Sequence, residues 1–320
     1  MNFLVTGVAG FIGFHLVNAL AKKKNKIIGV DNLNTYYDVT LKKNRINKLK
    51  EFKNFSFLKS DIQDKNLLLK LKRQRIDCLI NLAAQAGVRH SFKDPYSYIN
   101  SNILGHLNIM EIVKNKKIKK FIYASSSSVY GGNKKTPFSV SDRVDEPLSL
   151  YAASKKSCEL ITECYSKLFK INCIGLRFFT VYGPWGRPDM ATYIFTKNIL
   201  EKKTINIFNN GKMRRDFTYI DDIISGIEGA IKLENDHSFH NVYNLGNSHS
   251  ENLMDFVRLI EKELQIKAKI KFLPLQKGDV ISTFADIKKS RRDLKFKPKI
   301  KIKQGIPLFI KWYKSYHKLG

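Results

Sequence analysis

Acidic residues and long apolar runs are scarce in this sequence. Its 320 residues include 28 Asp and Glu against 57 Lys and Arg, which gives a formal net charge of +29. No apolar run of about 18 residues occurs, so we expect no segment that crosses a membrane. The opening residues, "MNFLVTGVAG", lack the basic start, apolar stretch and cleavage site of a signal peptide, and none is expected.

Cysteine is scarce as well. Cys78, Cys158, Cys164 and Cys173 show neither a CxxC pair nor zinc-finger spacing, so no metal site is expected. Three of the four fall in apolar segments. We interpret the set as buried, reduced thiols of a cytoplasmic protein.

The positive charge is the strongest compositional feature. A basic face can bind nucleic-acid phosphates, but these lysines are spread along the whole chain, without a basic stripe containing interleaved aromatics. Lys, Asn and Ile are abundant together, which is typical of an AT-rich coding bias. We therefore expect no nucleic-acid partner, although the positive field would attract an anionic substrate.

Short apolar runs alternate with helix-like segments in the first half of the chain. Runs typical of buried strands occur at Asn2–Thr6, Lys26–Asp31, Phe55–Asp61, Asp77–Ala84, Lys120–Ser126 and Asn172–Phe179. Segments with helical periodicity lie between them at Phe11–Lys23, Asn66–Arg73, Tyr96–Lys114 and Tyr151–Lys170. This alternation predicts an α/β fold, a Rossmann-type doubly wound parallel sheet with helices on both faces.

The regular alternation ends near residue 180, where "VYGPWGRPDM" is typical of a loop. A helix near Tyr193–Glu201, a short strand "INIF" and a strand-to-helix segment "RRDFTYIDDIISGIEGAIKL" follow, and the closing residues predict a packed basic amphipathic helix. We predict a Rossmann domain over residues 1–179, to which residues of about 217–245 return. Residues 180–320 would mainly form a smaller C-terminal α/β substrate domain.

Three glycines lie between the first strand and the first helix, in "GVAGFIG", at Gly7, Gly10 and Gly13. Glycines permit a tight turn and let backbone N–H groups and the helix N-terminus approach a pyrophosphate. Asp31 ends the second strand, where a carboxylate accepts the ribose hydroxyls and repels a 2′-phosphate, which favours NAD over NADP. Asp61 and Ile62 follow the third strand, in a position to meet the adenine.

A tyrosine and a lysine in "YAASK", Tyr151 and Lys155, are four residues apart on one face of a predicted helix. A free tyrosine, with a pKa of about 10, is a poor base, but a neighbouring ammonium and a positive nicotinamide ring favour the phenolate. Such a pair suits removal of a sugar hydroxyl proton while the hydrogen on the same carbon leaves as hydride. Because this spacing occurs by chance in many helices, its meaning depends on the other motifs.

Together these motifs resemble the extended short-chain dehydrogenase/reductase family (NAD-dependent epimerases and dehydratases), and within it the UDP-glucuronate 4-epimerases. The similarity runs from Met1 to about residue 310 and rests on "GVAGFIG", "DNLNTYYD", "NLAAQAGVRHS", "YASSSSVYG", "SLYAASKK", "RFFTVYGPWGRPDMA", "RRDFTYIDDI" and "VYNLGNS". The resemblance implies NAD-dependent epimerisation of UDP-glucuronate to UDP-galacturonate through a transient 4-keto sugar. The product would supply cell-surface polysaccharide.

The resemblance also implies roles for individual residues. Tyr151 would be the catalytic acid/base, Lys155 its partner, and Ser126 the hydroxyl that shares the substrate 4-OH. A tightly bound NAD, regenerated in each turnover, would contact Gly7, Gly10, Phe11, Ile12, Gly13, Asp31, Asn32, Asp61, Ile62, Leu82, Ala83 and Ala84, together with Tyr151 and Lys155.

Two further residues would bind the nucleotide of the substrate. Arg215 would meet the diphosphate and Asp279 the uridine ribose. The segment before Asp279 departs from the family pattern: Gln276 stands where hexose epimerases tend to carry another phosphate arginine, and Lys277 replaces a common proline. The way the diphosphate is neutralised is therefore left open by the sequence.

Four serines follow an apolar strand in "SSSSVYG", Ser125–Gly131. Family members that dehydrate a sugar carry an Asp–Glu pair just before "VYG", and sugar-acid decarboxylases carry a glutamate there. Ser127 and Ser128 occupy these positions and cannot act as acid or carboxylate base at neutral pH. The side chains that dehydration and decarboxylation require are therefore absent from these positions. The remaining reaction is oxidation at C4 followed by return of the hydride to the opposite face.

Neutral donors and one guanidinium are placed to bind a substrate carboxylate. Thr180 stands where many hexose epimerases have asparagine, and Arg187 can form charge-assisted hydrogen bonds. We assign Ser127, Ser128, Thr180 and Arg187 to the C6 carboxylate of glucuronate. Two alternatives stay open: a UDP-hexose or UDP-N-acetylhexosamine(uronate) 4-epimerase of the same fold, and a non-catalytic NAD-sensing scaffold, which would typically lose the reactive tyrosine.

The predicted helices Tyr96–Lys114 and Tyr151–Lys170 carry more apolar residues than one sheet face needs. In the family the equivalent helices form a dimer interface, so the resemblance implies a homodimer. A UDP-sugar is the expected ligand, with no nucleic acid and no membrane as partner, and the expected location is the cytoplasm.

Overall fold

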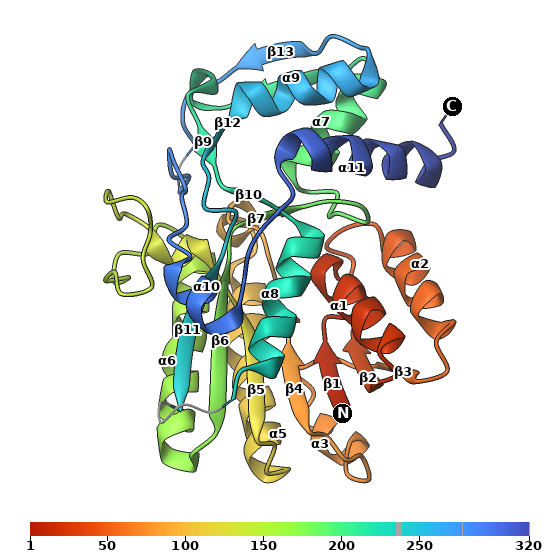
Figure 1. Ribbon diagram of the computed structural model, residues 1–320, viewed down its shortest axis with the longest axis vertical. Coiled ribbons are helices and arrows are strands. Elements are labelled where there is room, and N and C mark those ends of the chain that lie inside the picture. The colour runs from red at the N-terminus through yellow and green to blue at the C-terminus, as the bar shows by residue number, and fades with distance from the viewer. Residues whose placement is uncertain (235–238, 277, 320) are drawn as a thin grey trace.

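The computed structural model describes residues 1–234, 239–276 and 278–319, so Lys277 lies outside the described residues. A seven-stranded sheet forms its centre (Figure 1), with the strand order β11-β6-β5-β4-β1-β2-β3. The strands are β1 (Asn2–Thr6), β2 (Lys26–Asp31), β3 (Phe55–Lys59), β4 (Cys78–Asn81), β5 (Lys120–Ser126), β6 (Asn172–Phe178) and β11 (His240–Leu245). All neighbouring pairs are parallel. The predicted fold class is therefore confirmed.

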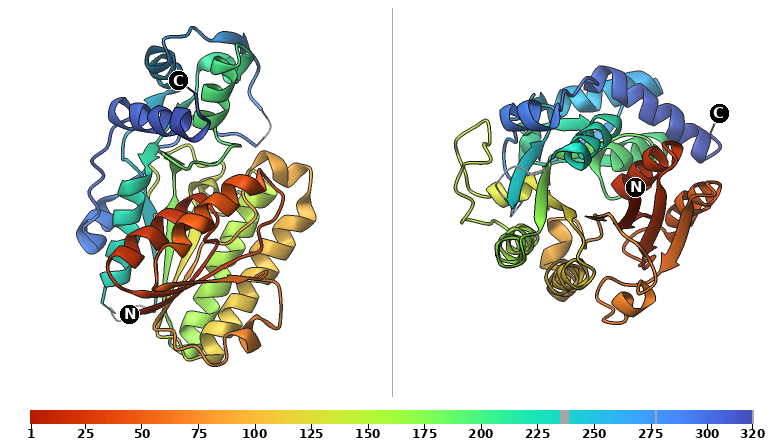
Figure 2. Two further views of the ribbon diagram at one scale, coloured as in Figure 1. Left: turned by 90° about the vertical axis from the view of Figure 1, so that its right-hand side faces the viewer. Right: turned by 60° about the horizontal axis from the view of Figure 1, so that its bottom comes forward.

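Helices cover both faces of this sheet (Figure 2). One face carries α1 (Phe11–Lys22), α2 (Val39–Lys50) and α8 (Ile220–Lys232), and the other carries α5 (Gly105–Asn115) and α6 (Leu150–Phe169). The short α3 (Leu67–Lys70) follows β3. The strand order reverses between β1 and β4, and sheets of this type bind ligands at the carboxyl ends of the strands at such a point.

A smaller group of elements lies above the carboxyl ends of the strands (Figure 1). It contains β7 (Thr180–Tyr182), α7 (Ala191–Leu200), β8 (Thr204–Ile207), β9 (Arg214–Arg215), β10 (Phe217–Tyr219), β12 (Glu251–Asn252), α9 (Leu253–Leu264), β13 (Lys269–Phe272) and α11 (Ile302–Tyr316). Two-stranded ladders join β7 with β10, β8 with β13 and β9 with β12. The predicted closing helix is α11, which packs against α9 and buries residues such as Phe309.

Two late segments lie against the large sheet. Strand β11 pairs with β6 along its whole length, and α10 (Lys288–Leu294) packs against β11 and α8. The chain after residue 180 therefore crosses between the two groups of elements more than once.

Several local predictions differ from the structure. The helix expected over Tyr96–Lys114 is divided into α4 (Pro95–Tyr98), a π-helical turn η2 (Ile99–Leu104) and α5. Helix α2 was not predicted, because its buried face includes the cations Lys42 and Arg45 and so lacks a clear apolar period. Cys78, Cys158 and Cys173 are buried as expected, but Cys164 is exposed because it lies on the outer face of α6.

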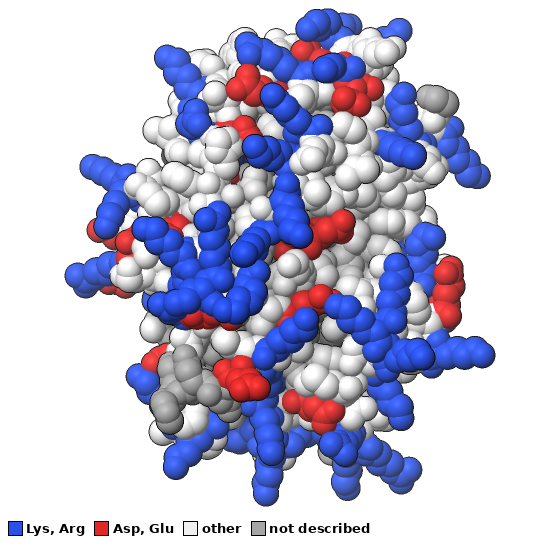
Figure 3. All heavy atoms as spheres, viewed as in Figure 1, with Lys and Arg blue, Asp and Glu red and all other residues white. Residues whose placement is uncertain are grey.

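Cationic side chains are spread over the whole visible face in Figure 3, with fewer acidic side chains between them. This distribution agrees with the dispersed lysines of the sequence. Among the described residues, no helix combines the length and the apolar character needed to cross a membrane.

Candidate active site

A large cavity of about 880 Å³ is lined both by residues of the sheet and its loops and by residues of the smaller group of elements. Every residue that the sequence assigns to cofactor or substrate lines it, namely Gly7, Gly10, Phe11, Ile12, Gly13, Asp31, Asn32, Asp61, Ile62, Leu82, Ala83, Ala84, Ser126, Ser127, Ser128, Tyr151, Lys155, Thr180, Arg187, Arg215 and Asp279. The fold thus brings together residues from the two ends of the sequence. Gln276 is not among the lining residues.

The glycine turn after β1 fits a dinucleotide. Gly7 has a φ of +73°, and a Cβ placed on it would lie 2.7 Å from the backbone nitrogen of Ala83. A Cβ on Gly13 would overlap the carbonyl oxygen of Gly7. Helix α1 begins after Gly10 without a side-chain cap, so its first N–H groups remain available to a pyrophosphate.

Asp31, at the end of β2, is held by the neighbouring backbone. Its Oδ2 accepts a hydrogen bond of 3.0 Å from Ala9 N, and its Oδ1 accepts one of 2.8 Å from Leu33 N. Burial raises the pKa of Asp31, while these bonds and the nearby Lys42 oppose the shift. Each carboxylate oxygen keeps a further lone pair, so the group can still accept ribose hydroxyls.

The serine row is the end of a strand followed by a tight turn. Ser125 also lines the cavity, but its hydroxyl donates a 2.6 Å hydrogen bond to Glu159 Oε1. Ser126 Oγ accepts a 3.1 Å bond from Ser128 N and so caps the 3₁₀ turn η3 (Ser127–Tyr130). All four serines of the row therefore line the cavity, and the Ser125 hydroxyl donates to Glu159.

Tyr151 and Lys155 lie in the first two turns of α6, whose N-cap Ser149 accepts a hydrogen bond from Ala152 N. Lys155 is 4% exposed, and its Nζ donates a 2.9 Å bond to the carbonyl oxygen of Ala124 at the end of β5. The Tyr151 ring meets the Tyr98 ring edge-on, with centroids 6.0 Å apart. Lys155 is thus held at the carboxyl edge of the sheet, and Tyr151 packs against Tyr98.

Arg187 is already part of an ion pair. Its Nε lies 3.0 Å from Asp189 Oδ1, its Nη2 lies 2.5 Å from Asp189 Oδ2, and Tyr36 donates a 2.9 Å bond to the same Oδ2. The guanidinium holds the pKa of Asp189 below its usual range, against the opposing effect of burial. Neither Asp189 nor Tyr36 was predicted from the sequence. Their contact joins residues 153 positions apart and therefore depends on the tertiary fold.

A second arginine, Arg89, also faces the cavity and was not assigned from the sequence. Its Nη2 lies 3.2 Å from Asp279 Oδ2, and its guanidinium lies over the Phe208 ring at 4.7 Å from the centroid. Arg215 donates to the carbonyl oxygens of Arg214 and Ile281, and burial lowers its pKa while Asp279 opposes that shift. The motif "NLAAQAGVRHS" contains Arg89, but no neighbouring residue indicates that its partner is Asp279.

A doubly wound parallel sheet with a glycine turn after β1 and a Tyr-x-x-x-Lys helix beside it defines a dinucleotide-dependent short-chain dehydrogenase/reductase of the extended type. The family model described as GDP-mannose 4,6-dehydratase matches residues 4–308, and the chain belongs to this family.

Three similar proteins match almost the whole chain, and two of them are UDP-glucuronate 4-epimerases. The chain is 52% identical to an uncharacterized protein of Methanocaldococcus jannaschii over 98% of this chain and 96% of that one. It is 44% identical to UDP-glucuronate 4-epimerase 4 of Arabidopsis thaliana, over 99% of this chain and 76% of the relative. The structure of the Bacillus cereus UDP-glucuronic acid 4-epimerase with UDP-glucuronic acid and NAD is 37% identical, with a TM-score of 0.93, covering 99% and 100% of the two chains.

Proposed function

We propose that this protein is an NAD-dependent epimerase that interconverts UDP-glucuronate and UDP-galacturonate. One observation carries the proposal: the cavity that contains the glycine turn and the Tyr151–Lys155 pair has serine at positions 127 and 128, and Thr180 and Arg187 line the same cavity. Within a family that includes dehydratases, this arrangement lacks the acid–base pair for elimination. The similarity to the Arabidopsis and Bacillus epimerases supports the same reading.

Bound NAD would accept a hydride from C4 of the sugar and return it. The fit of the glycine turn and of Asp31 supports NAD as the cofactor. The residues of the chain supply the proton transfer. Tyr151 would take the proton of the 4-hydroxyl, and Ser126 would share that hydroxyl through a hydrogen bond. Lys155, fixed by the carbonyl of Ala124, would place a positive charge beside the phenol.

The C6 carboxylate would bind between Ser127, Ser128, Thr180 and Arg187. Because Nε and Nη2 of Arg187 face Asp189, its Nη1 group remains for the substrate. Asp189 and Tyr36 would then set the orientation of the guanidinium. A 4-keto uronate is a β-keto acid that loses CO₂ when the carboxyl bond aligns with the carbonyl group. We propose that these donors hold the carboxylate out of that alignment.

The diphosphate would lie between Arg89 and Arg215. Both guanidinium groups interact with Asp279, and both line the cavity. Arg89 would thereby replace the cation that the sequence lacks at Gln276. The release of Arg89 from Asp279 would free the carboxylate for the uridine ribose.

A UDP-hexose or UDP-N-acetylhexosamine(uronate) 4-epimerase of the same fold is the competing function. Incubation of the pure protein with UDP-glucuronate, UDP-glucose and UDP-N-acetylglucosamine, followed by NMR of each product, tests the choice. We expect conversion of UDP-glucuronate at a catalytic efficiency far above that of the neutral sugars. Equal efficiency for UDP-glucose would contradict the role of the carboxylate site.

We also propose that the protein is a cytoplasmic homodimer that supplies UDP-galacturonate for polysaccharide, with a boundary near residue 180 between its cofactor and substrate domains. Helix α6 and the α4–η2 segment pack together and expose Tyr96, Ile99, Leu104, Leu160, Leu168 and Phe169. A second copy of this helix pair would cover these side chains. Sedimentation velocity of wild type and of Leu160→Glu tests the dimer, and a wild-type monomer at micromolar concentration would refute it.

A further inference from the structure

The loop that carries Arg187 is attached to the cofactor half of the molecule by side chains. Three consecutive carbonyl oxygens of this loop receive hydrogen bonds from α1 and α2. His15 Nε2 lies 2.8 Å from Pro184 O, and Arg45 Nη2 donates to Trp185 O at 2.5 Å and to Gly186 O at 3.3 Å. Burial keeps His15 neutral by lowering its pKa to about 4.

Arg45 also binds the glycine turn. Its Nη1 donates a 2.7 Å bond to Ala9 O, between Gly7 and Gly10, and a 2.8 Å bond to the Tyr37 hydroxyl. Ala9 in turn donates its N–H to Asp31 Oδ2. A continuous series of bonds therefore runs from Asp31, through Ala9 and Arg45, to the backbone next to Arg187.

The environment of Arg45 is costly for a cation. The side chain is fully buried, its oxygen partners are three carbonyls and a phenol, and its Nε has no hydrogen-bond partner among the described residues. Burying a charge without a carboxylate partner is unfavourable. An aliphatic side chain would fill this space without the cost of burying a charge, but it could not donate to the carbonyl oxygens. The guanidinium is therefore explained by the carbonyl oxygens that it holds in place.

The adjacent residues of the 32–38 loop reinforce this attachment. Tyr37 accepts from Arg45, while Tyr36 donates to Asp189, the partner of Arg187. Of these two consecutive tyrosines, one therefore contacts Arg45 and the other contacts the Arg187–Asp189 ion pair. The Trp185 ring lies 5.2 Å from the Phe14 ring of α1, which adds an apolar contact to the polar ones.

We propose that Arg45 is a positioning residue that fixes the 184–187 loop on the glycine turn, so that the cofactor site and the carboxylate site form one rigid unit. The proposal rests on the proposed function for the identity of the carboxylate. Arg45 would contact neither NAD nor substrate. It would act by setting the place of Arg187, and its loss would affect the sugar acid more than the nucleotide.

Two measurements on the NAD-loaded full chain test this role. The protein contains two tryptophans, so a Trp312→Phe background leaves Trp185, inside the loop itself, as the only tryptophan, which is excited selectively at wavelengths that tyrosine does not absorb. Arg45→Met removes all donors, and Arg45→Lys keeps the charge but cannot span Ala9 and Trp185 together. Arg75→Met, at an exposed arginine, is the matched control.

We expect Arg45→Met to increase acrylamide quenching of Trp185, while Arg75→Met leaves it unchanged. Calorimetry should show affinity for UDP-glucuronate lower by about 10–100-fold, the effect of losing hydrogen bonds to a charged group, with affinity for UDP nearly unchanged. Arg45→Lys should give intermediate values, and it replaces Arg45→Met if that variant does not fold.

Unchanged quenching, or equal weakening of UDP and UDP-glucuronate, would overturn the positioning role. The two proposals fail separately. If wild type does not bind or convert UDP-glucuronate, the proposed function is wrong, whereas the quenching measurement still decides whether Arg45 fixes the loop.

Discussion

Lys155 Nζ donates a 2.9 Å hydrogen bond to the carbonyl oxygen of Ala124, which ties the lysine of α6 to the end of β5, immediately before the serine row. Tyr151, one turn earlier, lines the same cavity as Ser126. The end of β5 therefore carries Ser126 and holds Lys155, and α6 places Tyr151 one turn before that lysine.

Tyr151→Phe should lower the turnover of UDP-glucuronate by about 10²–10⁴-fold, the usual contribution of a general acid–base group. The ring and its packing against Tyr98 remain, so affinity for the nucleotide sugar should stay close to wild type. Steady-state kinetics and calorimetry measure the two quantities. A variant with near-normal turnover would remove Tyr151 from the mechanism.

Thr180→Ala and Arg187→Ala should change the products as well as the rate. Without these donors the carboxylate of the 4-keto intermediate can rotate into alignment with the carbonyl group and leave as CO₂. The fraction of UDP-pentose product, measured by NMR, should therefore rise relative to UDP-galacturonate. Loss of rate without any pentose would contradict the proposed restraint.

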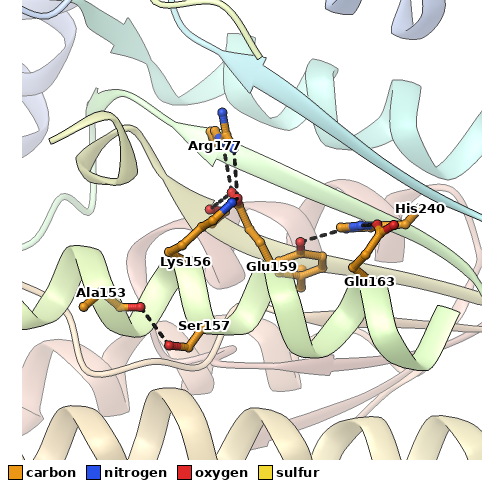
Figure 4. Close-up of polar contacts among 9 residues, drawn as sticks. Ala153, Lys156, Ser157, Glu159, Glu163, Arg177 and His240 are labelled. Carbon is orange, nitrogen blue, oxygen red and sulfur yellow. Dashed lines mark hydrogen bonds and ion pairs between the residues drawn. The ribbon is translucent and has the colours of Figure 1, made fainter. Parts of the chain in front are cut away.

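The buried pair below the serine row should be important for stability. Glu159 and Arg177 form two hydrogen bonds, of 2.8 and 2.9 Å, and both side chains are buried (Figure 4). Glu159→Gln leaves the guanidinium uncompensated and should lower the free energy of unfolding by about 3–5 kcal/mol.

The matched control for that variant is Glu228→Gln, which removes the surface ion pair with Lys23. Exposed pairs contribute about 0–1 kcal/mol, so this change should be small. Urea unfolding measures both variants. Similar losses of unfolding free energy for the two variants would contradict the prediction that the buried ion pair of Glu159 contributes more than an exposed one.

A fall in pH should lower the free energy of unfolding partly through the protonation of His15. Burial lowers its pKa to about 4 in the folded state, against about 6.5 when unfolded. As pH falls from about 6.5 to 4, the unfolded chain gains a proton at His15 that the folded chain does not, so this site removes about 3 kcal/mol of stability.

His15→Gln keeps a donor for Pro184 O but cannot titrate. Its free energy of unfolding should therefore fall less steeply than that of wild type between pH 6.5 and 4. Urea unfolding across this range measures the difference. Parallel pH profiles would show that His15 is not the titrating group.

Much of the fold could be predicted because its buried strands are continuous apolar runs. The bounds of β1, β2 and β5 agree with the sequence prediction, since each run ends at a glycine turn, an acid or the serine row. Helix α2 escaped prediction because Arg45 and Lys42 occupy its buried face, where a periodic pattern requires apolar residues.

The cavity lining could be predicted from motifs, but the contacts among its charged groups could not. Arg187 pairs with a residue two positions away, yet Tyr36 completes the arrangement from 153 positions away. Arg89 reaches Asp279 across 190 positions, and Arg45 reaches Trp185 across 140. Such pairings depend on the tertiary fold, and local periodicity carries no information about them.

The most direct test of a borrowed hydride uses UDP-glucuronate with deuterium at C4, incubated with the pure protein in ordinary water. If hydrogen leaves C4 as hydride and returns to the opposite face, NMR should find UDP-galacturonate that retains the deuterium at C4. Loss of the label to solvent, or a UDP-pentose as the main product, would contradict the account.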